Sequence, residues 1–388
     1  MFIFNQTQKL NSFDKPMSEQ NQGLFYRIHL DFPLLMGLVV LCLFGLIILY
    51  SASGQSLAKV EGQGIRLCMG FIAMMVIAQF SPQIIRRWSP PVYIIGVLLL
   101  LAVLITGDIG MGARRWLNLG FFRFQPSEFM KLIVPAMIAW LLSREPLPIR
   151  WSRFFICLVL ILIPAALIVV EPDLGTALLV VFSGCFVIYY AGISWRLLAF
   201  LGTLLSALLV ILLRFPELLD LVLKTYQKKR VLTFLNPEND PLGAGYHIIQ
   251  SKIAIGSGGG YGKGWLNGTQ SHLDFLPERH TDFIFSVIAE ELGLLGIILL
   301  LIMYLFILMR CLYIASQAQD SYSALLAGAI SLIFFVYIFV NIGMVSGLLP
   351  VVGVPLPLVS YGGTSAISIM MGFGFIMSIH THRKLMAH

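Results

Sequence analysis

Charged residues are scarce in this 388-residue sequence, where they make up 12% of the chain while 58% of its residues are hydrophobic. The mean hydropathy is +0.88, far above the value typical of a soluble globular domain. Such a composition excludes an ordinary soluble protein and indicates a protein that lies largely in a lipid bilayer.

Paired cysteines and a cleavable leader are also missing. The five cysteines stand singly in or beside apolar runs, without the spacing of a metal site or a disulfide framework. We therefore expect all five to be small core residues: Cys42, Cys68, Cys157, Cys185 and Cys311. Residues 1–31 are polar and lack the basic, apolar and small-residue order of a signal peptide, so the first apolar run is expected to be retained as a helix.

Long uncharged runs are abundant instead. A membrane-spanning helix needs roughly 20 apolar residues, and helices are the only economical way for such runs to satisfy their backbone in lipid. The sequence predicts an all-α polytopic membrane protein with about ten transmembrane helices. The predicted spans are 32–53, 65–80, 92–106, 129–143, 154–170, 174–191, 197–213, 283–309, 321–349 and 365–379.

The distribution of basic residues predicts the orientation. The net charge of +7 resides in loops between spans, which fits the positive-inside rule better than nucleic-acid binding. With a cytoplasmic N-terminus, the short inside segments hold twelve Lys and Arg residues and the short outside segments hold six. The six are Lys59, Arg66, Arg114, Arg115, Arg123 and Lys131.

This orientation divides the chain into three parts. We expect a cytoplasmic tail at 1–31, a single transmembrane domain at 32–379, and a cytoplasmic tail at 380–388. The loops with unusual sequences are then all outside: 107–127, 171–173, 350–364 and the large extracytoplasmic loop 214–282 between helices 7 and 8. A site assembled from several loops requires them on one face, so we expect the functional site there.

The loop at 107–127 carries Arg114 and Arg115 beside Trp116, and Pro126 then opens a helix. Glu128 and Lys131 are three residues apart on that helix and therefore share one face. They either pair or jointly contact a ligand, and charges near membrane depth are costly and often functional. For the arginines, a role as interfacial anchors is equally plausible.

In the loop at 171–173, Asp173 is favoured as the N-cap of the next helix, and Glu171 is left open. Within 214–282, the apolar spacing of 246–255 predicts a helix on the membrane surface that includes Lys252. The glycine-rich run 257–264 departs from a nucleotide P-loop in its residues and context. A flexible turn is preferred, although its amides remain candidates for contact with a diphosphate.

Asp282 follows Arg279 and His280 at the predicted membrane edge. A carboxylate so placed suits a general base, which needs a tuned proton affinity and reach to the hydroxyl that it deprotonates. A helix N-cap is the equally weighted alternative. Glu290 and Glu291 lie deeper in the same span and imply a polar cavity or a partner.

The loop at 350–364 is apolar yet full of helix breakers. Irregular backbone at membrane depth is tolerated where it lines a cavity walled by protein. A re-entrant gate of a transporter would have the same character.

Five long motifs resemble those of the shape, elongation, division and sporulation family of bacterial membrane proteins, and most closely its elongation member. They follow one another in the family's order over nearly the whole chain after the N-terminal tail. The motifs are Arg115-Trp116-Leu117 with Phe124-Gln125-Pro126-Ser127-Glu128, Pro172-Asp173-Leu174-Gly175-Thr176, residues 240–252, residues 277–285, and residues 355–363.

The resemblance implies ten transmembrane helices, cytoplasmic termini and a peptidoglycan glycosyltransferase of the cytoplasmic membrane that polymerises lipid II on the outer face during cell elongation and rod-shape maintenance. Asp282 matches the family's essential aspartate, and Glu128 and Lys131 match a required charged pair. Glu171 is a weaker match, because some relatives carry Gln there. The substrate-binding candidates are Glu128, Lys131, Arg115, Lys252, Arg279 and Ser360.

The resemblance further implies a class B penicillin-binding protein as partner and undecaprenyl diphosphate as leaving group. As a hypothesis, Asp282 activates the acceptor 4-hydroxyl, and cations on the outer face stabilise the departing diphosphate. No ligand cluster demands a metal, although a divalent cation would be able to assist. The alternatives are a flippase or transporter of the lipid-linked precursor and a non-enzymatic scaffold.

Overall fold

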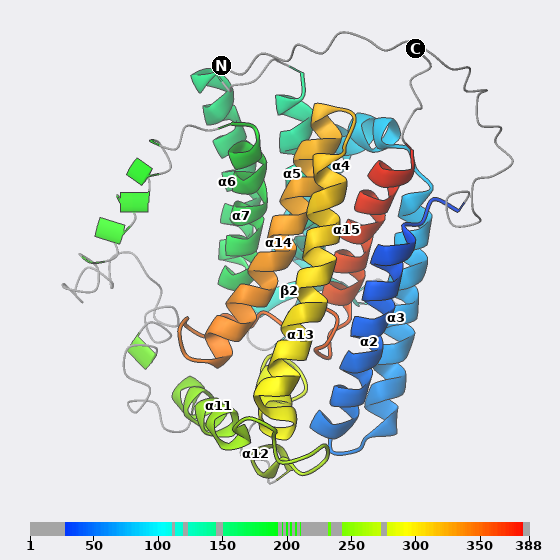
Figure 1. Cartoon of the computed structure of the whole chain (residues 1–388). Coiled ribbons are helices and arrows are strands. Elements are labelled where there is room, and N and C mark those ends of the chain that lie inside the picture. Colours follow the sequence, from blue (N-terminus) through cyan, green and yellow to red (C-terminus); the bar gives the residue numbers. More distant parts are fainter. Residues whose placement is uncertain are drawn as a thin grey trace, which may run out of the picture.

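The computed structural model is a bundle of long helices with an elaborated end (Figure 1). It describes residues 28–110, 113–118, 123–144, 150–192, 243–272 and 278–382, with short pieces between 196 and 233. The predicted all-helical, multi-spanning fold is confirmed. The helices that overlap predicted spans are α2 (Phe32–Ala52), α3 (Leu57–Ala78), α4 (Pro82–Thr106), α5 (Pro126–Leu142), α6 (Trp151–Val170), α7 (Leu174–Tyr190), α13 (Ile284–Ser316), α14 (Ser321–Val345) and α15 (Thr364–Thr381). The predicted spans at 65–80 and 92–106 began too late, because the first turns of α3 and α4 contain charged and polar residues.

Seven of these helices are long and apolar enough to cross a membrane, namely α2, α3, α4, α6, α13, α14 and α15. α5 and α7 are shorter, at 17 residues each. The predicted seventh span, 197–213, lies outside the described residues except for short pieces. Large apolar side chains on the outer sides of the bundle are exposed, including Ile72, Ile105 and Leu299, which is expected for a surface in contact with lipid tails.

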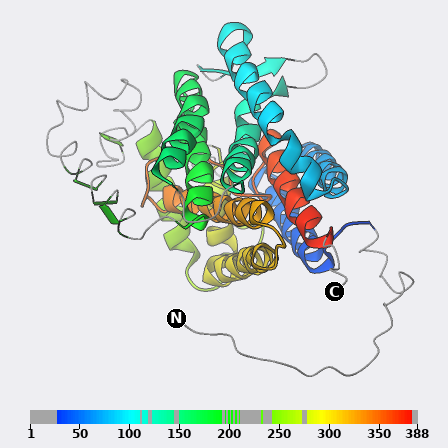
Figure 2. The same ribbon diagram turned by 90° about the horizontal axis from the view of Figure 1, so that it is seen from above.

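Helix α14 forms the centre of the bundle. It packs against α5, α7, α13 and α15. Of its most apolar 18-residue stretch, 67% is buried. α3 lies alongside α15, while α4 and α6 pack on α5. Figure 2 looks down the bundle and shows the strands beside the cyan helix α4 at its edge.

One end of the bundle is held by an ionic cluster. Asp31 caps α2 by accepting from Leu34 N at 2.9 Å. Its carboxylate also accepts two bonds from Arg310, at 3.0 and 2.6 Å, and lies 3.3 Å from His380 Nε2. The start of α2, the end of α13 and the end of α15 therefore meet at the same end of the bundle.

The opposite end carries a small sheet that the sequence analysis missed. Strand β1 (Asp108–Gly110) pairs antiparallel with β2 (Ala113–Asn118), and β2 pairs antiparallel with β3 (Arg123–Phe124). Strands of two to six residues are too short to show an alternating pattern. The sheet matters for the site because β2 carries Arg115.

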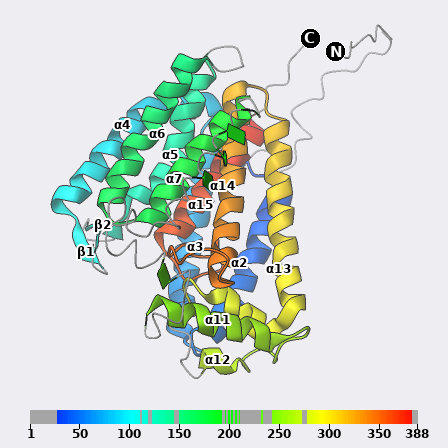
Figure 3. The same cartoon turned by 90° about the vertical axis from the view of Figure 1, so that its left-hand side faces the viewer.

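At the same end, α11 (Ala244–Gly258) lies across the bundle and packs against α13, with the short α12 (Thr269–His272) beside it (Figure 3). The predicted helix over 246–255 is thus confirmed. α11 is fixed by Ser251, whose hydroxyl donates to the carbonyl of Val345 at the end of α14.

The glycine-rich segment after α11 is not a free turn. Helix α13 is broken at Gly293, where φ is +63°, and the segment pairs with the broken backbone. Lys263 N and Gly264 N donate to the carbonyls of Glu290 and Glu291 at 3.0 and 2.9 Å. A methyl group on Gly262 would lie 2.1 Å from Glu291 O, so only glycine fits. These two amides are occupied, which argues against the proposed amide contact with a diphosphate at Lys263 and Gly264.

The cysteine prediction was only partly right. Cys42, Cys157 and Cys311 are buried core residues, whereas Cys68 is exposed and Cys185 is partly exposed. Cys68 is exposed on the outer side of α3, where a small apolar side chain is compatible with lipid contact.

Candidate functional site

Asp282 belongs to a turn segment that precedes α13 and is not the cap of that helix. Phe283 occupies the N-cap position and makes no side-chain capping bond. The backbone carbonyl of Asp282 accepts from Asn341 Nδ2 at 2.9 Å. A methyl group placed on Gly353 would lie 3.5 Å from Asp282 Oδ2. Asp282 is partly exposed, and its carboxylate lies against the irregular loop before α15.

That loop, residues 350–363, connects the outer-end elements. The Val352 carbonyl lies close to Gly175 at the start of α7: a methyl group added to Gly175 would be only 2.7 Å from this oxygen. Val354 packs with Leu179 and Tyr337, and its carbonyl accepts from Asn341 Nδ2 at 2.7 Å. Asn341 thus holds both Asp282 and the loop through one buried amide group.

Glu128 and Lys131 form the predicted pair inside the bundle. Lys131 Nζ lies 2.6 Å from Glu128 Oε1, and the two side chains are 5% and 9% exposed. Lys131 also donates to the Tyr337 hydroxyl, and Ser368 Oγ lies 3.2 Å from Glu128 Oε2. Because Tyr337 contacts both Lys131 and Val354, the charged pair is joined to the loop beside Asp282 through one aromatic ring.

The turn between α6 and α7 adds a second group of charges. Asp173 caps α7 by accepting from Thr176 N at 3.2 Å, as predicted. Arg115 donates to the Pro172 carbonyl at 2.8 Å and lies 3.8 Å from Asp173 Oδ2. Arg115 is thus brought to this turn by β2, on the same side of the bundle as Gly175 and Val352.

Glu171 is buried in the same turn, at 2% exposure. Neither of its carboxylate oxygens has a hydrogen-bonding partner among the described residues. Burial and the charge of Asp173 raise the pKa of Glu171 to about 8, although the charge of Arg115 opposes this shift. Glu171 is therefore a mostly neutral acid at pH 7.

Ser360 is buried and its hydroxyl is fully engaged. It donates to the Thr281 carbonyl at 2.6 Å and accepts from Leu356 N at 2.9 Å. The geometry thus favours a positioning role, since the bond to Thr281 fixes the residue before Asp282. The predicted role in contacting substrate stays a prediction.

The other two predicted cations, Arg279 and Lys252, contact α2 and the turn after α14. Arg279 Nε donates to the Ala52 carbonyl at 2.8 Å and so ties the segment before Asp282 to the end of α2. Lys252 is exposed on α11, and its Nζ would lie 2.7 Å from a methyl group on Gly347. Neither residue belongs to the contacts that join Asp282 to Lys131.

The two buried acids of α13 have partners. Glu290 accepts from Lys263 Nζ at 2.7 Å and from Gln270 N at 2.9 Å. Glu291 accepts from the Ser51 hydroxyl of α2. The expected partners therefore exist, and they brace the end of α13 that follows Asp282.

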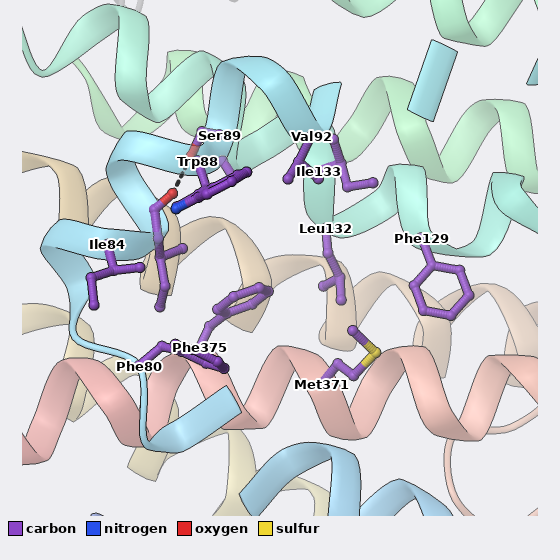
Figure 4. A pocket seen from close by; sticks show the side chains of 12 residues that line it. Phe80, Ile84, Trp88, Ser89, Val92, Phe129, Leu132, Ile133, Met371 and Phe375 are labelled. Carbon is purple, nitrogen blue, oxygen red and sulfur yellow. Dashed lines mark hydrogen bonds between the residues drawn. The ribbon is translucent and has the colours of Figure 1, made fainter. Parts of the chain in front are cut away.

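An apolar groove of about 410 Å³ opens beside the charged pair, between α4, α5 and α15 (Figure 4). Leu132 lines this groove and also a smaller pocket that contains Glu128 and Lys131. The main lining side chains are Phe80, Ile84, Trp88, Phe129, Leu132 and Phe375. Its walls suit a hydrocarbon chain, and one of its lining residues is next to the cation Lys131.

Among the described residues, no group of three or more His, Cys, Asp or Glu side chains is arranged to hold a metal ion. The requirement for a divalent cation stays an open prediction.

Three site residues escaped the sequence analysis: Asn341, Tyr337 and Gln63. Asn341 and Tyr337 are polar groups within the apolar run 321–349, and a buried amide in a membrane helix is a usable signal. Gln63, whose Nε2 donates to the Ser360 carbonyl at 3.2 Å, is 1% exposed on α3. It had no such signal, since it precedes the run predicted to span the membrane.

Comparisons with known proteins identify the family of this chain. Residues 31–385 match the FtsW, RodA and SpoVE family of cell cycle proteins. The chain belongs to this family. It is 52% identical over 95% of its length to the peptidoglycan glycosyltransferase MrdB of Escherichia coli K12, of which it covers 98%. It is 36% identical to stage V sporulation protein E of Bacillus subtilis, over 91% of this chain and 98% of that protein.

Solved structures of the same family share the fold. A chain from a peptidoglycan synthase complex, studied for its coordination of polymerization and crosslinking, superposes with a TM-score of 0.77 at 33% identity and covers 91% of this chain and 99% of its own. The rod shape determining protein RodA of Thermus thermophilus superposes with a TM-score of 0.68 at 27% identity, over 91% of this chain and 98% of that chain.

Proposed function

We propose that this chain, a peptidoglycan glycosyltransferase of the RodA and MrdB type that acts in cell elongation, polymerises lipid II with Asp282 as its general base. The observation that carries the proposal is the placement of Asp282. Its carboxylate faces Gly353 in a loop that contacts, through Val354 and Tyr337, the buried cation Lys131.

The reaction joins two lipid-linked saccharides. Asp282 removes the proton from the 4-hydroxyl of the acceptor sugar, and that oxygen attacks the anomeric carbon of the lipid-linked donor. A β-1,4 C–O bond forms with inversion, while the bond between the anomeric carbon and the phosphate oxygen breaks. Its electron pair leaves with undecaprenyl diphosphate. We assign the stabilisation of that charge to Lys131 and Arg115, the cations bonded to Glu128 and to the Pro172 carbonyl.

The lipid tail belongs in the groove between α4, α5 and α15. Polyprenyl chains are apolar, and the groove is lined by aromatic and aliphatic side chains. Leu132 contributes to both this groove and the pocket of Lys131, so tail and diphosphate would be held by adjacent turns of α5. We place the tail here rather than at the loop 350–363, whose backbone is occupied by contacts with Asn341 and Tyr304.

We infer the orientation from the basic residues at one end of the bundle. Arg86 and Arg310 lie at the end that carries Asp31 and His380, which we assign to the cytoplasm by the positive-inside rule. Asp282, β2 and α11 then face outward, and both termini are cytoplasmic. A class B penicillin-binding protein is the partner that we expect to cross-link the product, in keeping with the synthase complex to which this chain is similar.

The experiment reconstitutes the chain with its transpeptidase partner and labelled lipid II, and measures polymer length. The proposal expects polymer from the parent and from Glu278→Gln, an exposed acid in the same segment, and none from Asp282→Ala. A parent that moves lipid II across the bilayer and makes no polymer would favour the flippase alternative. Equal polymer from the parent and Asp282→Ala would remove Asp282 from catalysis.

A further inference from the structure

One face of α3 presents two cations to the end of the loop 350–363. Lys59, Gln63 and Arg66 are spaced four and three residues apart, so they share that face. Gln63 fixes it by donating Nε2 to the Ser360 carbonyl and by accepting from Gly362 N, each at 3.2 Å. The positions of Lys59 and Arg66 relative to the loop are therefore set by a buried amide between them.

Arg66 is held over an aromatic ring. Its Cζ lies 4.4 Å from the centroid of Tyr361, and its Nε would lie 3.5 Å from a methyl group on Gly363. A cation–π contact positions a guanidinium, but a ring face uses few of its five N–H donors. Arg66 is thus oriented and still able to donate hydrogen bonds.

His280 connects this face to Asp282. Tyr361 N donates to the His280 carbonyl at 2.9 Å, and the two rings are 5.8 Å apart. Burial lowers the pKa of His280, and the charges of Lys59 and Arg279 lower it further. The charge of Glu278 acts in the opposite direction. Lys59 and His280 therefore lie in the same positive region. His280 and Asp282 are two residues apart, a chain length of at most about 7 Å.

Two cations of this region, Lys59 and Arg66, have no counter-ion among the described residues. Within the described part of the chain, neither Lys59 nor Arg66 makes an ion pair with a carboxylate, although both are partly buried. Glu61 is exposed on another side of α3, and the Glu278 carboxylate accepts from Thr281 Oγ1 at 2.6 Å. Partly buried cations without a fixed partner indicate a place for a mobile anion.

We propose that Lys59 and Arg66 form an anion subsite, the α3 subsite, which binds the diphosphate of a lipid-linked saccharide substrate. Seven residues of helix separate them by about 10 Å along α3, and long side chains over that distance can converge on one diphosphate. The inference rests on the proposed function, because a polymerase joins two lipid-linked saccharides and must hold two diphosphates at once.

The two cation groups approach Asp282 by separate routes. Lys131 is linked to it through Tyr337 and Val354, whereas Arg66 is linked through Tyr361 and His280. Each cation group binds one diphosphate. Lys131 and Arg115 bind that of the departing lipid, and the α3 subsite binds that of the second lipid-linked saccharide.

The test compares the parent with the double variant Lys59→Gln/Arg66→Gln and with Arg87→Gln, which removes an exposed charge from the opposite end of the bundle. Initial rates of lipid II polymerisation are measured against substrate concentration. The α3 subsite predicts a KM raised about tenfold in the double variant, from the loss of charged hydrogen bonds, with kcat within about threefold. Arg87→Gln keeps the parent KM, and Arg66→Lys recovers part of the loss. An unfolding temperature matching the parent excludes a folding defect.

A binding arm needs no turnover. Undecaprenyl diphosphate, titrated with quenching of tryptophan fluorescence in nanodiscs, should show two binding sites in the parent, and the double variant should lose one of them. Two sites in the double variant, with both Kd values unchanged, overturn the α3 subsite even if the parent proves inactive. If the parent makes no polymer, the proposed polymerase function fails separately. A defect present only in nanodiscs that contain phosphatidylglycerol would instead assign the cations to phospholipid headgroups and would overturn the proposal.

Discussion

The buried pair Glu128 and Lys131 makes a quantitative prediction about stability. The Glu128 side chain is 9% exposed, and Lys131→Met would leave its carboxylate bonded to Ser368 alone. Glu128→Gln would leave the ammonium of Lys131 without its counter-ion. Breaking one side of a buried ion pair costs about 3–5 kcal/mol, because the remaining charge is uncompensated. We expect each single variant to lose about 3 kcal/mol of unfolding free energy.

The double variant Glu128→Gln/Lys131→Met should lose less unfolding free energy than either single variant. Replacing a buried pair by neutral groups of similar volume is often nearly neutral, and the remaining cost comes from the hydroxyls of Tyr337 and Ser368, at about 1 kcal/mol each. We therefore expect a loss of about 2 kcal/mol and a coupling energy of about 3–4 kcal/mol between the two sites.

The assay is equilibrium unfolding in mixed micelles by titration with dodecyl sulfate, followed by tryptophan fluorescence. Arg87→Met, at an exposed position, serves as the control and should change stability by less than about 0.5 kcal/mol. Additive losses in the two single variants, with a coupling energy below about 0.5 kcal/mol, would refute the reasoning that the pair is electrostatically coupled in a dry environment.

Two further predictions concern groups around the site. Asn341→Leu removes the donor shared by the carbonyls of Asp282 and Val354, so kcat for lipid II polymerisation should fall about 100-fold with little change in KM; a raised KM at normal kcat would contradict this. Glu171 has a pKa of about 8 instead of 4.5, so the folded protein keeps a proton that the unfolded chain releases. Stability should therefore fall as pH rises from about 5 to 8, by up to about 1.4 kcal/mol per pH unit. Glu171→Gln, whose neutral amide mimics the protonated acid, should remove most of this slope in thermal unfolding between pH 5 and 9, and an unchanged slope would rule Glu171 out.

The sequence predicted the elements that depend on local signals. Apolar runs located the helices, Pro126 marked the start of α5, and the spacing of Glu128 and Lys131 predicted their pairing. Asp173 caps α7 because an acid before a helix can accept its first amide protons. These features need only a few neighbouring residues, so pattern and spacing suffice.

Long-range features were beyond that reasoning. The glycine-rich segment 257–264 hydrogen-bonds to the break in α13, about thirty residues later in the chain. Gly262 has no side chain because the Glu291 carbonyl lies against it, a contact that no local pattern specifies. Lys59 and Arg66 were read as topology residues, because their approach to Tyr361 and His280 depends on how α3 packs against α15. Asn341 carried a usable signal as an amide in an apolar helix, but its two acceptors come from distant loops.

The most direct test of the role of Asp282 separates binding from bond formation. Single-turnover mixing of labelled lipid II with the partner complex measures the first glycosidic bond, while Kd for lipid II is measured separately. We predict that Asp282→Asn binds lipid II within about twofold of the parent and forms the bond 10²- to 10⁴-fold more slowly, the contribution typical of a general base. A rate within about threefold of the parent at unchanged Kd would show that Asp282 is not the base.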